Sequence, residues 1–142
     1  MPDICYAHVT DEITLHRVLD LCCGILGERV CQRAPYRRED WLARLAECPE
    51  LLLYAADGER IVSAVLGRPE SAESLVCGFV ACDEAYRRQG ITRRLMGMLA
   101  DAACQKAFRY ITLGSDADGF YEKCGYMPIS EIHGQTIYQL LL

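Results

Sequence analysis

The stretch with the most chemical potential runs from Phe79 to Arg93, where an expected strand ends, a short basic turn follows and a long helix begins. The first N–H groups of a helix have no partners within the helix, and the helix dipole adds partial positive charge there. Gly90 has no side chain to block a ligand, so a phosphate can rest on these amides. Arg87, Arg88 and Arg93 can add charge-assisted hydrogen bonds. The junction predicts an anion site, although a tight turn with a solvated basic face has the same pattern.

The charge distribution supports a small phosphorylated ligand. The chain has 15 basic and 20 acidic residues and a net charge of -5, which argues against general nucleic-acid binding. Arginine accounts for 13 of the 15 cations, and four of them, residues 87, 88, 93 and 94, fall within eight positions. The glycine-rich signatures of dinucleotide-binding and NTPase folds are absent, which excludes both readings.

The nine cysteines do not form a recognisable metal or disulfide pattern. Their spacing is irregular, their number is odd, and no Cys-x-x-Cys pair occurs. Only His8, His16 and His133 are available to assist a metal site. We therefore expect reduced, mostly buried thiols and no metal, with a zinc or redox protein as an alternative that a thiol titration would test.

Length and composition predict a single domain over residues 1–142. Hydrophobic residues make up 51% of the chain, which is enough for a packed core, and no apolar run approaches the roughly 20 residues that cross a bilayer. The first residues, Met1 to Ile4, lack the basic and apolar regions of a secretory signal. We expect a soluble, cytoplasmic protein that does not bind membranes.

The elements that must position the basic turn alternate between strands and helices. A strand over Ile4–Val9 precedes a helix that starts near Thr10 and ends at Gly24 or Gly27, and a second helix lies between Pro35 and Pro49. A meander of three strands, 51–56, 61–66 and 75–82, comes next, with a hairpin turn at Asp57-Gly58. Gly78, inside the third of these strands, predicts a bulge or a close backbone approach.

The second half of the chain continues the alternation. A long helix follows Gly90, with an apolar stripe from Ile91 to Ala103. The next strand, 110–113, should run parallel to the strand before the helix because a helical crossover joins them. A short helix near 120–123 and two final strands, 126–132 and 136–142, complete one sheet of mixed α/β (α+β) class.

Two motifs resemble those of the GNAT superfamily of acetyl-CoA-dependent N-acetyltransferases. Arg87-x-x-Gly90-x-Thr92 is similar to its Arg/Gln-x-x-Gly-x-Gly/Ala loop, and Phe120-Tyr121-Glu122-Lys123-Cys124-Gly125-Tyr126 to its Phe/Leu-Tyr-x-x-x-Gly-Phe/Tyr segment. The likeness is strong over residues 51–126 and weak over the first fifty. It implies a mostly antiparallel sheet with two splayed parallel strands and about four helices.

The resemblance also implies a cofactor site. Val80, Ala81 and Cys82 would hold the pantetheine arm of acetyl-CoA through backbone hydrogen bonds, and the Val80 N–H would face the oxyanion. The pyrophosphate would lie on the loop and on the first helical turn, formed by Arg87, Arg88, Gln89, Gly90, Ile91, Thr92 and Arg93. Thr92 departs from the usual Gly or Ala, and its hydroxyl either donates to a phosphate or narrows the loop.

In enzymes with the second motif, the tyrosine at the position of Tyr121 protonates the leaving thiolate; packing against pantetheine or within the core is the alternative. No general base is identified. The position at which some relatives have a glutamate is Val76, and the possible substitutes, more typical of solvated surface residues, are Glu73, Asp83, Glu131 and His133.

The function implied is transfer of an acetyl group from acetyl-CoA to a primary amine by direct attack in a ternary complex. A route through a covalent cysteine is disfavoured because no histidine lies near Cys77, Cys82 or Cys124 in sequence. The acceptor, a small molecule or a peptide, would approach residues 21–41 and 130–135, where Tyr36, Arg37, Arg38 and Trp41 can line the site, although Trp41 has the spacing of a core residue. Monomer and homodimer both remain open. An acyl-CoA-binding sensor with little turnover is the alternative function.

Overall fold

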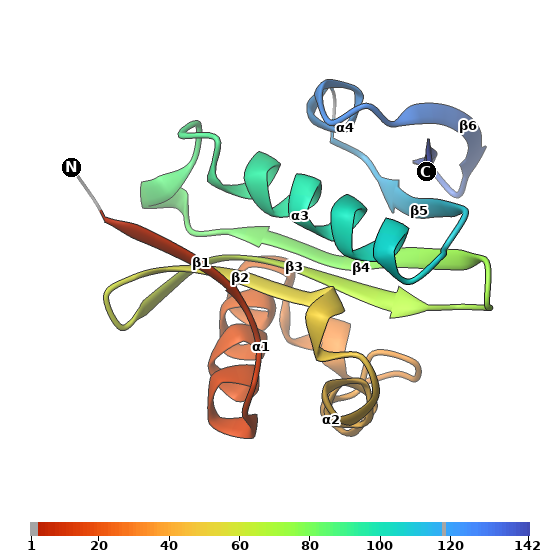
Figure 1. Ribbon diagram of the computed structural model, residues 1–142. Helices are drawn as coiled ribbons and strands as arrows, with labels where there is room; N and C mark the ends of the chain where they lie inside the picture. The colour runs from red at the N-terminus through yellow and green to blue at the C-terminus, as the bar shows by residue number, and fades with distance from the viewer. Residues whose placement is uncertain (1–2, 118) are drawn as a thin grey trace.

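The protein folds around one mixed seven-stranded sheet with helices on both faces (Figure 1). The computed structural model describes residues 3–117 and 119–142. The strands lie in the order β1-β2-β3-β4-β5-β7-β6. Helices α1 and α2 lie on one face of the sheet and α3 lies on the other (Figure 1). This arrangement confirms the mixed α/β class and the four helices expected from the sequence.

The elements follow the predicted order, with ends that differ by a few residues. The strands are β1 Ile4–His8, β2 Leu52–Asp57, β3 Arg60–Pro69, β4 Ser74–Cys82, β5 Tyr110–Ser115, β6 Met127–Ile132 and β7 Gln135–Leu141. The α-helices are α1 Glu12–Leu26, α2 Arg38–Glu47, α3 Ile91–Gln105 and α4 Phe120–Lys123. Three short 3₁₀ helices were not expected: η1 Glu28–Cys31, η2 Pro49–Leu51 and η3 Glu84–Tyr86.

Helix α1 begins one residue after the predicted N-cap and ends at Gly27, one of the two predicted glycines. Asp11, rather than Thr10, is its N-cap, because the Asp11 carboxylate accepts a hydrogen bond from the Thr14 N–H at 2.8 Å. The helix runs past Gly24 and ends at Gly27, whose φ of 102° turns the chain away. The following segment carries a cis peptide bond between Ala34 and Pro35 before α2 begins.

Strand β4 changes the face toward which its side chains point at Gly78. Leu75 and Cys77 pack in the core cluster that contains α3, whereas Phe79 and Ala81 pack in the cluster that contains α1. Strict alternation would place all four on one face. The register between β3 and β4 shifts here, which marks the predicted bulge, and a Cβ at Gly78 would lie 2.9 Å from the Tyr36 ring. Bulge and close approach therefore occur together.

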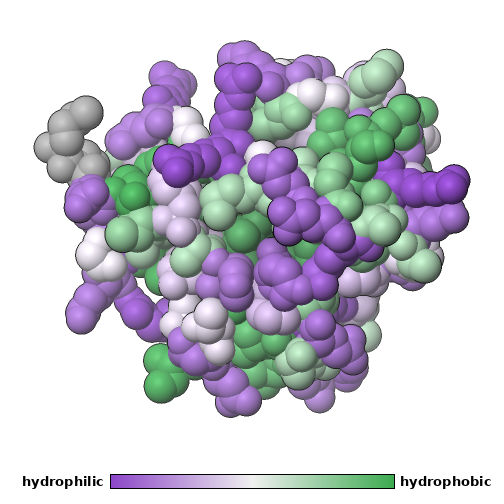
Figure 2. Space-filling model, in the orientation of Figure 1, coloured by the Kyte–Doolittle hydropathy of each residue, from purple (hydrophilic) through white to green (hydrophobic). Residues whose placement is uncertain are grey.

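The last two strands leave apolar side chains exposed. All six residues of β6, one of the two edge strands of the sheet, are exposed. The large exposed apolar residues of this region are Met127, Ile129, Ile132, Leu141 and Leu142. Hydrophobic surface gathers on the side of the molecule where β6 lies (Figure 2). No helix within residues 3–117 and 119–142 is both long and apolar enough to span a membrane.

Candidate functional site

The two parallel strands of the sheet separate after three residue pairs. Strand β4 pairs with β5 at Ser74–Tyr110, Leu75–Ile111 and Val76–Thr112. The antiparallel pairing with β3 continues along β4 as far as Cys82. The outer half of β4 therefore has a partner on one side only, which is the splayed geometry that the sequence motifs imply.

The hydrogen-bonding phase of β4 determines which amides face the opening. The Asp83 N–H donates to the Val62 carbonyl at 2.8 Å. Because bonded and non-bonded pairs alternate in an antiparallel ladder, Ala81 also bonds to β3. The N–H groups of Val80 and Cys82 point the other way, toward the space that β5 has left.

The N-terminus of α3 adjoins this space. The Arg94 N–H donates to the Gly90 carbonyl at 3.0 Å and is the first helical hydrogen bond. The N–H groups of Ile91, Thr92 and Arg93 precede that bond and have no partner within the helix. Gly90 has a φ of 78°, and a Cβ built on it would meet nothing within 4 Å. Glycine suits this position because the backbone is left-handed and the space in front of it is open.

The loop between β4 and α3 is fixed to the β2–β3 hairpin by three side-chain contacts. The Tyr86 hydroxyl donates to Asp57 Oδ2 at 2.6 Å. Arg60 donates to Asp83 Oδ2 at 2.7 Å, and its guanidinium lies 5.1 Å from the centre of the Tyr86 ring. These contacts hold the basic loop in place before any ligand binds, which lowers the entropy that binding would cost.

A cavity of about 580 Å³ occupies the space between the separated strands and the loop. Most of its walls come from the residues that the sequence motifs singled out. It is lined by Val80, Cys82, Tyr86, Arg87, Arg88, Gly90, Ile91, Thr92, Arg93, Ala117, Phe120 and Lys123. Its combination of apolar walls, free amides and four cationic side chains can hold a long ligand that has an anionic end.

Three predicted site residues do not line this cavity. Ala81 is buried on the opposite face, and its N–H belongs to the ladder with β3, so neither group reaches the cavity. Gln89 lies in the exposed loop without forming part of the wall. Tyr121 is buried beside the cavity, whereas its neighbour Phe120 forms part of the lining.

The Tyr121 ring is packed among other aromatic rings at the inner end of the strand opening. Its centroid lies 5.0 Å from that of Phe120, 5.4 Å from that of Tyr138 and 6.2 Å from that of Tyr126. Burial raises the pKa of Tyr121 above that of an ordinary phenol, and the nearby Cys77 sulfur adds to this shift. The phenol thus keeps its proton and sits close to the part of β4 where β5 diverges.

The Thr92 hydroxyl has a different partner from the one proposed for it. Its oxygen lies 2.8 Å from Ser63 Oγ, and Ser63, which is fully buried, donates its own proton to the Ala81 carbonyl. The Thr92 proton must therefore point at Ser63 rather than at a phosphate. The side chain ties the first turn of α3 to β3, and only the Thr92 N–H remains for an anion.

The candidate bases are engaged or remote. Asp83 accepts hydrogen bonds from the Ala85 N–H and from Arg60, which lower the pKa of its carboxyl. Glu73 lies 3.8 Å from Arg109. Glu131 and His133 are exposed in the β6–β7 hairpin. None of the four lines the cavity.

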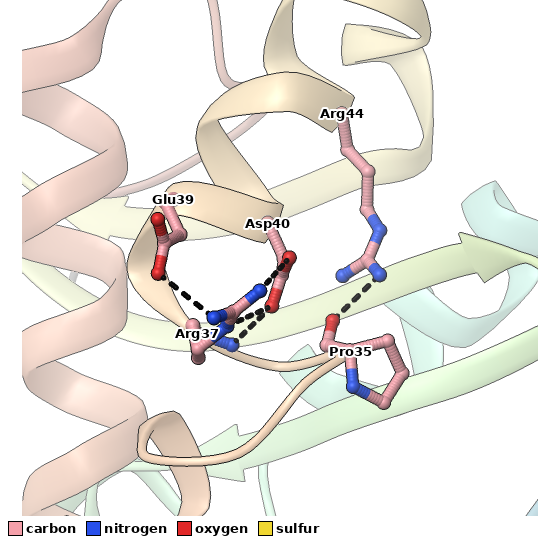
Figure 3. A network of polar contacts seen from close by, with 5 residues as sticks. All are labelled: Pro35, Arg37, Glu39, Asp40 and Arg44. Carbon is pink, nitrogen blue, oxygen red and sulfur yellow. Dashed lines mark hydrogen bonds and ion pairs between the residues drawn. The ribbon is translucent and has the colours of Figure 1, made fainter.

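Residues on the proposed acceptor side have mostly structural contacts. Trp41 is fully buried, as its helical spacing predicts. Tyr36 stacks on Phe79 with ring centroids 5.3 Å apart. Arg37 pairs with Glu39 and Asp40, and Arg38 pairs with Asp20 (Figure 3 shows the Arg37 contacts).

The cavity also includes residues that sequence reasoning did not select. Phe120 and Lys123 lie within the second motif and Tyr86 directly precedes the first, but only the structure shows that these three side chains face the cavity. Ala117, just after β5, carried no signal. The nine cysteines are free, four of them buried, and no group of three or more metal-ligating side chains occurs among the described residues.

Comparison with solved structures gives the same fold over nearly the whole chain. The PaiA N-acetyltransferase from Thermoplasma acidophilum in complex with coenzyme A is 12% identical, with a TM-score of 0.78 and coverage of 99% of each chain. A chain of the NatC complex bound to Gag peptide and CoA is 18% identical, with a TM-score of 0.76 and coverage of 99% of each. An agmatine N-acetyltransferase mutant is 13% identical, with a TM-score of 0.76 and coverage of 99% of this chain and 100% of the other.

No curated protein matches the chain significantly. The model of the acetyltransferase (GNAT) family, in contrast, matches residues 15–126, which include the separated strands, the basic loop and the tyrosine-containing motif. The chain therefore belongs to the acetyltransferase (GNAT) family.

Proposed function

We propose that this protein transfers an acetyl group from acetyl-CoA to a primary amine of a small molecule or a peptide. The observation that carries the proposal is the cavity where β4 leaves β5 beside the free N-terminus of α3. A thioester arm fits between the separated strands, and a diphosphate fits on the amides of Ile91, Thr92 and Arg93. Arg87, Arg88 and Arg93 supply the opposing charge.

Val80 and Tyr121 have separate roles in the proposed reaction. The Val80 N–H, which faces the opening, donates to the oxygen of the thioester as negative charge develops on it. The amine nitrogen forms a bond to the carbonyl carbon, the carbon–sulfur bond breaks, and the departing sulfur takes the proton of the Tyr121 phenol. Tyr121 is suited to this role because a phenol is protonated at neutral pH, and burial raises its pKa further. No described acid or histidine lines the cavity, so the amine loses its proton to water.

The acceptor approaches from the face that carries α1 and α2. The bulge at Gly78 brings β4 close to Tyr36 on that face, so the acceptor and the thioester arm meet across one strand. The solved relatives include one bound to a peptide and one named for agmatine. An amine panel for the assay therefore needs both peptide N-termini and small amines such as agmatine.

Two Gly90 variants that strain the backbone to the same extent test the cofactor site. Gly90→Glu and Gly90→Gln both force a side chain into a left-handed backbone, and they differ only in charge. By calorimetry, acetyl-CoA should bind the Glu variant at least tenfold more weakly than the Gln variant, because the carboxylate faces the phosphates. Equal acetyl-CoA affinities for the two variants, or no binding to the wild type, would show that the loop before α3 does not hold the diphosphate.

A turnover assay separates an enzyme from a binding module. Wild-type protein is mixed with acetyl-CoA and each member of the amine panel, and release of free thiol is followed. Amine-dependent release supports acetyl transfer. Tight acetyl-CoA binding without release over the whole panel would instead favour the acyl-CoA sensor, which is motivated by the lack of an acid among the described residues of the cavity wall.

A further inference from the structure

Two cysteines outside the cofactor cavity meet at the end of α1. Cys23 lies in the last turns of α1, and Cys31 is the last residue of η1. Their sulfur atoms are 3.1 Å apart, although the two residues lie eight positions apart in the sequence. The left-handed Gly27 turns the chain back on itself and brings the two thiols together. The irregular cysteine spacing of the sequence gave no sign of this contact.

The surroundings of the pair differ from those of a buried core thiol. A second cavity, of about 440 Å³, is lined by both cysteines together with Glu28, Gln32, Arg37, Arg38 and Glu39. Cys31 is half-buried and reachable through it, whereas Cys23 is almost fully buried behind it. The adjacent Cys22 does not line the cavity and packs in the core.

A cation, Arg38, lines the same cavity as the two cysteines. Arg38 donates to Asp20 at 2.7 Å and to the His16 carbonyl at 3.3 Å, which fixes its guanidinium along the α1 face that also carries Cys23. Arg38 interacts electrostatically with both Cys23 and Cys31. This positive charge lowers the pKa of Cys31, but burial and the Cys23 sulfur outweigh it, so the thiolate that oxidation requires is a minor species.

We propose that Cys23 and Cys31 form a redox-sensitive dithiol that a low-molecular-weight disulfide, such as oxidised glutathione, converts reversibly into an intramolecular disulfide. The sulfurs must approach by about 1 Å to reach the bond length of roughly 2.05 Å. Proximity makes the second step unimolecular, which favours ring closure over a lasting mixed disulfide.

The oxidation proceeds through two thiol–disulfide exchange steps. The Cys31 sulfur, as thiolate, attacks one sulfur of oxidised glutathione, forms a mixed disulfide and expels one glutathione thiolate. The Cys23 sulfur, after losing its proton to solvent, attacks Cys31 Sγ and expels the second. The protein loses two hydrogens, and the oxidant is reduced to two molecules of glutathione. Burial and the neighbouring Cys23 sulfur raise the pKa of Cys31 to about 12, so only a small fraction is thiolate at neutral pH and the exchange should speed up as the pH rises.

The disulfide would fix the segment that leads to the acceptor face. Beyond Cys31, the chain is tied down by Arg44, which donates to the Pro35 carbonyl at 2.6 Å, and by Arg37, which pairs with Asp40 (Figure 3). Tyr36, between these ties, packs on β4 at the bulge. The reduced pair leaves the turn at residues 24–30 held only by non-covalent contacts, and oxidation removes that freedom.

The experiment treats the full-length reduced protein with about 1 mM oxidised glutathione at pH 8.5. Peptide mapping should link Cys23 to Cys31, the intact mass should fall by about 2 Da, and Tm should rise by roughly 5–10 °C because a short loop is closed. Dithiothreitol should reverse all three changes. These readouts do not depend on acetyl transfer, so the result stands apart from the proposed activity.

Cysteine-to-serine variants test which thiols form the disulfide. Cys31→Ser and Cys23→Ser should each abolish the mass loss and the Tm rise, and Cys31→Ser carries little risk to folding because the side chain is half-exposed. Cys104→Ser, which changes an exposed thiol on α3, should behave as the wild type. A stable glutathione adduct on Cys31, or a disulfide between any other pair, would overturn the proposal.

Discussion

At the scale of single residues, contacts within the protein hold the key side chains of the cofactor cavity in place. Tyr121 is the clearest case: its ring is held by three aromatic neighbours and its phenol is buried, so its position does not depend on the ligand. Thr92 is a second case, because its hydroxyl serves the fold rather than the ligand.

Tyr121→Phe should lower kcat by about 10²-fold, because the departing sulfur then leaves without a proton donor, while the KM for acetyl-CoA changes little. Tyr126→Phe is the matched control, since it removes another buried phenol from the same core, and it should leave kcat close to wild type. Steady-state kinetics of purified variants provide the measurement. Equal kcat values for the two variants would refute the acid role.

The pH profile tests the same residue in a different way. Burial raises the pKa of Tyr121, so the acidic form is fully present below the ordinary phenol pKa of about 10 and is lost only above it. The kcat of the wild type should therefore not fall between pH 7 and pH 9.5 through loss of this proton. A falling limb with an apparent pKa below 9 that disappears in Tyr121→Phe would contradict this prediction.

Thr92→Val should destabilise the protein by about 1 kcal/mol, because it removes the hydrogen bond to Ser63 without changing the size of the side chain. Thr92→Ser, which keeps the hydroxyl, should cost less. Urea unfolding measures both free energies. If Thr92→Val proves as stable as Thr92→Ser, the hydroxyl does not anchor the first turn of α3.

At the scale of elements, the site exists because β4 has two halves. Its first half pairs with β5, and its second half, beyond the bulge, pairs only with β3 and turns Val80 and Cys82 toward the opening. Gly78 marks the change, and the contacts of the α1–α2 segment with Gly78 show why no larger residue fits there.

Gly78→Ala should destabilise the protein by about 1–3 kcal/mol, because the new Cβ would lie 2.9 Å from Tyr36 Cε1 and 3.1 Å from Trp41 Cη2. Trp41 is fully buried and cannot move away cheaply. Gly97→Ala in α3 is the control of opposite sign: its Cβ meets nothing within 4 Å, so helix propensity should add about 0.5–1 kcal/mol. Thermal or urea unfolding measures whether each variant is less or more stable than the wild type.

At the scale of the whole molecule, the net charge and the local charge have opposite effects on an anionic ligand. The chain carries -5 overall, whereas Arg87, Arg88 and Arg93 line the cavity. A ligand that touches these arginines experiences mainly their local field, because salt screens distant surface charges beyond about 10 Å at 0.1 M.

Raising NaCl from about 50 mM to 500 mM should therefore weaken acetyl-CoA binding several-fold, as measured by calorimetry. If the net charge dominated, salt would strengthen binding instead. Arg87→Gln should reduce the salt dependence, and Arg17→Gln, on an exposed part of α1, should leave it unchanged. A salt effect of the opposite sign would show that the loop does not hold the anion.

Most of the fold was predictable because its signals are local. Alternating apolar residues, capping residues and the turn at Asp57-Gly58 lie within a few positions of each other, and the strands and helices they predict are all present. The predicted N-cap at Thr10 was one residue early because the Thr14 N–H can be reached by Asp11, a choice that only side-chain geometry makes. The segment between α1 and α2, with its cis peptide bond, lay beyond local reasoning.

The sequence by itself determined the order of elements, the basic loop before α3 and the motif that contains Tyr121, because each depends on residue types that are close along the chain. Only the tertiary structure decided that Ala81 points away from the cavity, that Thr92 bonds to Ser63 and that Cys23 meets Cys31. These three outcomes depend on strand register, on a bulge and on a chain reversal. Such features bring together residues that are distant in sequence, and the final packing sets them rather than any local preference.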